Sequence, residues 1–61
     1  MTLEQERWAE ALAIDRQFGE CAPVHVAERI AALALQDDEE GVNRWVQIAA
    51  RLDQLRGASL Q

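Results

Sequence analysis

Residues 23–35, PVHVAERIAALAL, form the most apolar stretch of this chain and lie at its centre. At 100° per residue, their apolar side chains cover roughly 200° of a helix. The remaining strip consists of His25, Glu28, Arg29, Ala32 and Gln36. So wide an apolar arc predicts a central helix that contacts a helix on each of two sides, with room for a second subunit.

Before this stretch, the sequence predicts a helix over about residues 3–18. Thr2 and Gln5 have the spacing of a capping box, and Gly19 stands where a glycine commonly ends a helix. The predicted apolar face comprises Trp8, Ala11, Leu12, Ile14 and Phe18. Asp15 falls on this face, and a carboxylate there needs a partner, so we expect it to pair with an arginine of another helix or to cap a backbone amide.

After the central stretch, a third helix is predicted over about residues 38–56. Asp37 or Asp38 is expected to cap it, and with Asp37 as the cap, Glu40 would complete a capping box. Gly57 is expected to end it as a glycine just outside the helix. Its predicted apolar face comprises Val42, Trp45, Val46, Ile48, Ala49, Leu52 and Leu55.

Together the segments predict an all-α fold, with a single domain over residues 1–57 and a frayed tail over 58–61. Short loops make sequential helices antiparallel neighbours. We therefore expect an up-down-up three-helix bundle with helices at about 3–18, 23–36 (Pro23 first) and 38–56. The alternative is a hairpin of the second and third helices, with the first helix swapped onto a second subunit. A chain of 61 residues has a small core, so it needs well-formed helix packing, oligomerisation or both.

The composition limits the classes of function. The formal charge is −5, and all six basic residues are arginine. This balance opposes non-specific binding to nucleic acid and anionic lipid. The first residues, MTLEQERW, do not resemble a signal peptide, and no apolar run is long enough to span a membrane. A single cysteine fits a reducing compartment. We therefore expect a soluble, cytoplasmic protein without a membrane partner.

Few residues point to chemistry. Cys21 and His25 lie four residues apart near a predicted helix start, where a thiol pKa can fall, but no further catalytic group accompanies them. We expect an incidental or packing cysteine. One cysteine and one histidine are too few for a structural zinc site, and we expect no cofactor, metal or small-molecule substrate.

Two sets of residues are candidates for binding. The first set, for a protein partner, combines a predicted exposed strip with the two tryptophans, a residue type frequent at binding hot spots: Trp8, His25, Arg29 and Trp45. The second set is the acid-free polar face of the third helix, which suits base recognition: Asn43, Arg44, Gln47, Arg51 and Gln54. The overall charge and the acids at the start of that helix count against nucleic acid as the partner.

Several short strings resemble a group of very small bacterial proteins of unknown function, associated with alphaproteobacteria. They are Glu6-Arg7-Trp8, Ala27-Glu28-Arg29-Ile30, Trp45 and Ile48-Ala49-Ala50-Arg51-Leu52. The resemblance spans nearly the whole chain and implies a compact helical domain. It implies no activity, cofactor or site.

The sequence as a whole favours a small non-enzymatic interaction or regulatory module that self-associates as a homodimer. The first alternative is a nucleic-acid-binding helical domain that uses the polar face of the third helix. The second alternative is a thiol-based redox sensor at Cys21.

Overall fold

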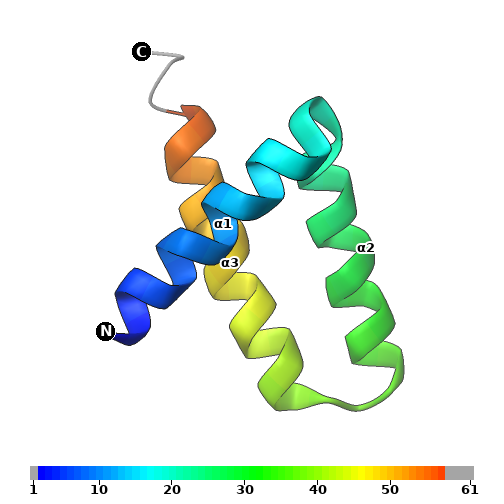
Figure 1. Cartoon of the computed structure of the whole chain (residues 1–61). Coiled ribbons are helices and arrows are strands. Elements are labelled where there is room, and N and C mark those ends of the chain that lie inside the picture. Colours follow the sequence, from blue (N-terminus) through cyan, green and yellow to red (C-terminus); the bar gives the residue numbers. More distant parts are fainter. Residues whose placement is uncertain (1, 58–61) are drawn as a thin grey trace.

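The computed structural model describes residues 2–57, and this part of the chain is all-helical, as predicted. Helix α1 spans Leu3–Phe18, a 3-10 turn η1 spans Gly19–Cys21, α2 spans Ala22–Leu35 and α3 spans Glu39–Gly57. Because α1, η1 and α2 follow one another without a break, residues 3–35 form one helical path with a sharp corner at η1 (Figure 1). The predicted tail, residues 58–61, lies outside the described residues.

The helices are not aligned as the predicted up-down-up bundle requires. Helix α1 crosses α3, whereas α2 and α3 form a hairpin closed by residues 36–38 (Figure 1). Helix α3 packs against both other helices, and α1 makes far fewer contacts with α2. Helix α2 does contact both other helices, as expected, but α3 rather than α2 holds the central position. In this structure α1 packs on α3 of its own chain.

The core is small and lies where α1 crosses the hairpin. Its fully buried cluster comprises Ala11 of α1, Ala22 and Val26 of α2, and Ile48 and Leu52 of α3. Two of these five side chains are methyl groups, which allow the helix backbones to approach closely. Around them pack the partly buried residues Ile14, Phe18, Ile30, Trp45 and Ala49. Leu12 and Val46, which were predicted on apolar faces, are 39% and 50% exposed.

The start of α1 confirms the predicted cap. The backbone N–H of Gln5 donates to the Thr2 hydroxyl at 3.1 Å, and the Thr2 N–H donates to the Gln5 side-chain carbonyl at 2.9 Å. This is a complete capping box. At the other end Gly19 has a φ of +56°, the positive φ that favours glycine there.

The hairpin turn is more specific than the sequence indicated. Asp37 has a left-handed φ of +58°. Its N–H donates to the Ala34 carbonyl, and the Asp38 N–H donates to the Leu33 carbonyl, which is the Schellman pattern. Asp38, not Asp37, caps α3, because its carboxylate accepts from the Gly41 N–H at 3.0 Å. The alternative with Asp37 as the cap is therefore wrong.

Four predicted helix bounds shift by one residue, because α2 spans residues 22–35 rather than 23–36 and α3 spans 39–57 rather than 38–56. Gly57 is the last residue of α3 and not the residue beyond it, and Pro23 is the second residue of α2 and not the first. Proline is tolerated at both positions because neither amide has a partner within the helix. None of the helices in the described part of the chain is long and apolar enough to cross a membrane.

Candidate functional site

One side of α2 presents an uninterrupted apolar surface that no other helix of the described chain covers. We call it the open face of α2, and its six residues are Pro23, Val24, Ala27, Ala31, Ala34 and Leu35. All six are exposed, with Val24 at 58% and Leu35 at 88%. At 3.6 residues per turn they share an arc of about 120°. This is the part of the wide apolar arc of α2 that α3 and α1 leave uncovered.

An apolar groove continues from the open face toward α3. Its volume is about 410 Å³. Helix α3 contributes Val46, Ala49, Ala50 and Leu52, with Asp53 and Arg56 as its only charged lining residues. Helix α2 contributes Pro23, Val26, Ala27 and Ile30. Since Pro23 and Ala27 belong to both, the open face and the groove form one surface. Sequence reasoning identified these apolar positions but not which of them would remain uncovered.

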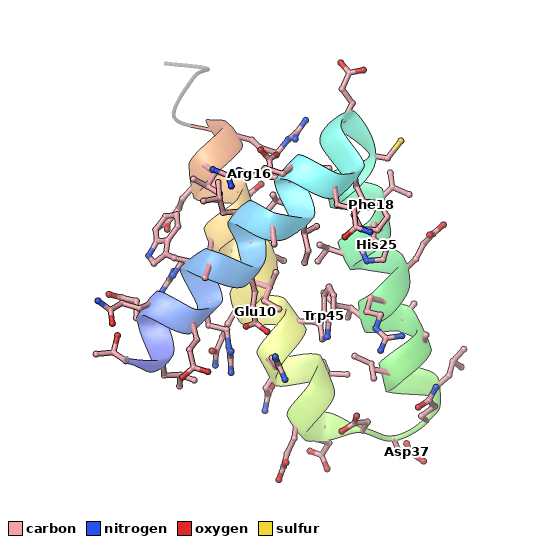
Figure 2. The ribbon with its side chains drawn as sticks, viewed as in Figure 1. Glu10, Arg16, Phe18, His25, Asp37 and Trp45 are labelled. Atoms are coloured by element: carbon pink, nitrogen blue, oxygen red, sulfur yellow. The ribbon has the colours of Figure 1, made fainter. Side chains whose placement is uncertain are left out.

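The predicted partner-binding residues do not form a single exposed site. His25 was expected on a solvated strip, but its ring is half-buried and stacks on Phe18, with ring centroids 3.9 Å apart and planes 14° apart. Its edge contact with Trp45 has a centroid distance of 5.9 Å. Arg29 is exposed and its guanidinium lies 5.6 Å from the Trp45 ring centroid. Figure 2 shows Phe18, His25 and Trp45 gathered between the three helices. The contacts of His25 are therefore internal.

The fourth predicted residue, Trp8, lies apart from this aromatic group. It is half-buried on α1, and the guanidinium of Arg51 lies 5.5 Å from its ring centroid. A cation over an indole face is a stabilising contact. Trp8 therefore joins α1 to α3, and it is not adjacent to the open face of α2.

The polar face of α3, the predicted alternative site for nucleic acid, faces α1 along much of its length. Arg44 forms an ion pair with Glu10, and Arg51 pairs with Glu4 at 3.4 Å. The Gln47 side chain accepts from Arg7 at 3.2 Å. Asn43 and Gln54 are exposed. Three of the five predicted side chains thus have partners on α1, and two of these partners are carboxylates.

Glu10 is the centre of this polar contact. It accepts hydrogen bonds from Arg44 and from Arg7, the latter at 2.6 Å. Burial raises the pKa of the Glu10 carboxyl, but the hydrogen bonds from Arg44 and Arg7 lower it more, so its pKa lies below the ordinary value. The same contact raises the pKa of Arg44, chiefly through its hydrogen bond to Glu10. Glu10 therefore stays ionised and ties α1 to α3.

Asp15 has the first of its two predicted kinds of partner, an arginine of another helix. Arg56 of α3 donates to its carboxylate at 2.8 Å and also to the Gly19 carbonyl at 3.0 Å. This one guanidinium therefore binds both the last turn of α1 and the corner that follows it. The role of Asp15 here is structural.

The remaining candidate, Cys21, lies exposed in η1 at the corner of the molecule. The His25 ring four residues later is occupied by its contacts with Phe18 and Trp45. Within residues 2–57, no three His, Cys, Asp or Glu side chains are grouped so that they could hold a metal ion.

The comparisons with known proteins give a family and no function. No curated protein and no solved structure matches the chain. A protein-family model matches residues 3–59, nearly the whole sequence, and confirms the resemblance to an uncharacterised family. The association with alphaproteobacteria stays a prediction. The chain belongs to the family of unknown function DUF6961.

Proposed function

We propose that this protein is a small, non-enzymatic interaction module that self-associates through the open face of α2. The observation that carries the proposal is the exposure of six neighbouring face positions without one polar side chain among them. Contiguous exposed apolar surface is uncommon on small soluble proteins and marks interaction sites. The proposal includes a cytoplasmic homodimer built from one compact three-helix domain per copy.

The rest of the surface supports this choice of face. The chain carries a net charge of −5, and its ionisable groups leave the open face free of charge. Ions are costly to desolvate, so an uncharged apolar face is the part of this surface that is easiest to bury. The polar face of α3 is a poorer candidate for binding, because Arg44 and Arg51 already pair with carboxylates of α1.

Sedimentation velocity over a range of micromolar concentrations tests the proposal. We expect a reversible dimer. Ala31→Glu places a charge in the middle of the open face and should abolish self-association. Ala13→Glu is the matched control, because Ala13 is an exposed helical alanine on α1, away from that face. A wild-type chain that sediments only as a monomer, or equal effects of the two substitutions, contradicts the proposal.

A further inference from the structure

We infer that the groove between α2 and α3 binds a basic amphipathic helix of another protein. This inference goes beyond the proposed self-association and does not rest on it. The groove has a volume of about 410 Å³, and all its lining residues belong to α2 and α3. These two helices form an antiparallel hairpin, so a helix laid along the groove would contact both of them (Figure 1). A helix bound in an apolar groove is a recurring form of protein recognition.

The shape of the groove follows from its small side chains. Val26 and Leu52 lie at its base, each only 2% exposed. Ala27 of α2 and Ala50 of α3 line it and are exposed. Because these alanines carry only methyl groups, larger aliphatic side chains of an incoming helix can pack between α2 and α3.

Carboxylates mark both ends of the groove. Glu39, Val46 and Asp53 recur every seven residues of α3, so they share one stripe of that helix. Val46 and Asp53 line the groove, and Glu39 lies about 10 Å beyond Val46 along the same stripe. Both acids are exposed, and the ion pairs of the described residues include neither. About 21 Å therefore separates two carboxylates that are available to a partner.

Positive charge is largely directed away from the groove. Of the six arginines only Arg56 lines it, and its guanidinium is bound to the Asp15 carboxylate at 2.8 Å. Arg44 and Arg51 pair with carboxylates of α1, and Arg29 lies over an indole ring. Together with the net charge of −5, this distribution favours a basic partner over an acidic one.

These features define the chemistry of the partner helix. Its aliphatic residues recur at intervals of three and four, which places them on the face that enters the groove. Lysine or arginine residues about four turns apart, close to 21 Å, would reach Glu39 at one end and Asp53 at the other.

Three synthetic peptides of about 18 residues test the inference with the full chain, because this length as a helix exceeds the spacing of the two carboxylates. The first peptide has leucine and alanine on one helical face and lysine on the other. The second peptide replaces every lysine with glutamate, and the third has the residues of the first in an order without an apolar face. Fluorescence anisotropy of labelled peptide measures binding. We expect only the first peptide to bind at micromolar concentrations, and its binding should weaken as salt rises.

Two pairs of matched variants locate the binding. Ala50→Arg fills the groove and repels a basic helix, so it should weaken binding by about tenfold or more, whereas Ala13→Arg on α1 should not. Asp53→Asn should weaken binding by about threefold. Glu28→Gln removes the same charge from an exposed position of α2 outside the groove and should have less effect. Circular dichroism checks that each variant is folded.

The outcomes decide between the groove and general attraction to an acidic protein. Equal effects within each pair of variants, or equal binding of the first and third peptides, would mean that net charge alone attracts the peptide and would overturn the inference. Equal binding of the acidic peptide, or no binding of the basic one, would also overturn it. Ala50 and Asp53 lie outside the open face of α2, so sedimentation of the chain alone decides self-association separately.

Discussion

Asp37 is the residue whose backbone conformation is least suited to its side chain. Its φ of +58° lies in the left-handed region, which L-residues occupy at a cost of about 1–2 kcal/mol. Aspartate tolerates the region better than most residues, and glycine adopts it freely. Asp37→Gly should therefore raise the free energy of unfolding by about 0.5 kcal/mol, after allowance for the greater freedom of glycine in the unfolded chain. Urea titration measures the change.

The control for this prediction is a residue that the turn disfavours. Asp37→Val should lower the free energy of unfolding by about 1 kcal/mol or more, since β-branched residues avoid a positive φ. The opposite order of the two variants would mean that the Asp37 carboxylate stabilises the turn more than its backbone strain destabilises it.

Glu10 should make stability depend on pH in the acid range. Its pKa in the folded chain lies below the ordinary value of 4.5, because hydrogen bonds from Arg44 and Arg7 outweigh the effect of burial. A lowered carboxyl pKa adds stability above the unfolded pKa, and this is lost as the pH falls through the folded pKa. Glu10→Gln should therefore cost less than about 1 kcal/mol near neutral pH, and the cost should shrink as the pH falls through the folded pKa, as urea titrations at neutral and at acid pH would measure. If Glu10→Gln destabilises the chain equally at acid pH, the ionised form of Glu10 is not the source of its contribution to stability.

At the scale of elements, the first turn of α3 makes the effect of a substitution at Gly41 depend on the capping residue Asp38. A Cβ on Gly41 would lie 2.5 Å from Oδ2 of Asp38 and 3.2 Å from Cδ2 of Leu33. Alanine is better than glycine inside a helix by about 1 kcal/mol. Here the added methyl group displaces the capping carboxylate, and loss of a cap costs about as much. Gly41→Ala should therefore give no gain in stability.

A double-mutant cycle tests this coupling. With Asp38→Ala the cap is already absent and its carboxylate no longer obstructs the methyl group, so Gly41→Ala should now stabilise the chain by several tenths of a kcal/mol. Chemical denaturation of the four proteins gives the interaction energy. Additive effects would mean that the carboxylate moves aside at no cost and still caps the helix.

Helix positions were predictable because their signals are local. The capping box of Thr2 and Gln5, Gly19, and the acids before α3 each act within a few residues, and every predicted boundary lies within one residue of the structure. The Schellman turn was missed because it uses an aspartate where glycine is usual. The shift of Gly57 into α3 has no comparable local signal.

At the scale of the molecule, the arrangement of the helices was not predictable from their faces. The apolar arc of α2 is wide enough for two neighbours, and nothing in its periodicity indicates which part α3 would cover. Helix α1 crosses α3 partly through ion pairs, and such pairs link residues more than thirty positions apart, such as Glu10 and Arg44. For the same reason the sequence could indicate an uncovered side of α2 only in general terms, and the six residues of the open face follow from the packing.

The aromatic group of Phe18, His25 and Trp45 joins all three helices and should be important for their arrangement. The His25 ring stacks on Phe18 of α1 and meets Trp45 of α3 edge-on. Aromatic pairs add about 0.5–1.5 kcal/mol beyond the area they bury. His25→Ala removes both contacts and should lower the free energy of unfolding by about 1–3 kcal/mol. It should also weaken the near-ultraviolet circular dichroism of Trp45.

The matched substitution is His25→Phe, which keeps a ring at the same place without an ionisable group. If the contacts act through ring packing, this variant should retain the tryptophan signal and most of the stability. Trp45→Phe provides the assignment of that signal, since Trp8 is the only other tryptophan. If His25→Phe is as unstable as His25→Ala, the imidazole nitrogens are what the three helices require. If neither variant changes stability, the ion pairs of α1 with α3 hold the arrangement without the aromatic group.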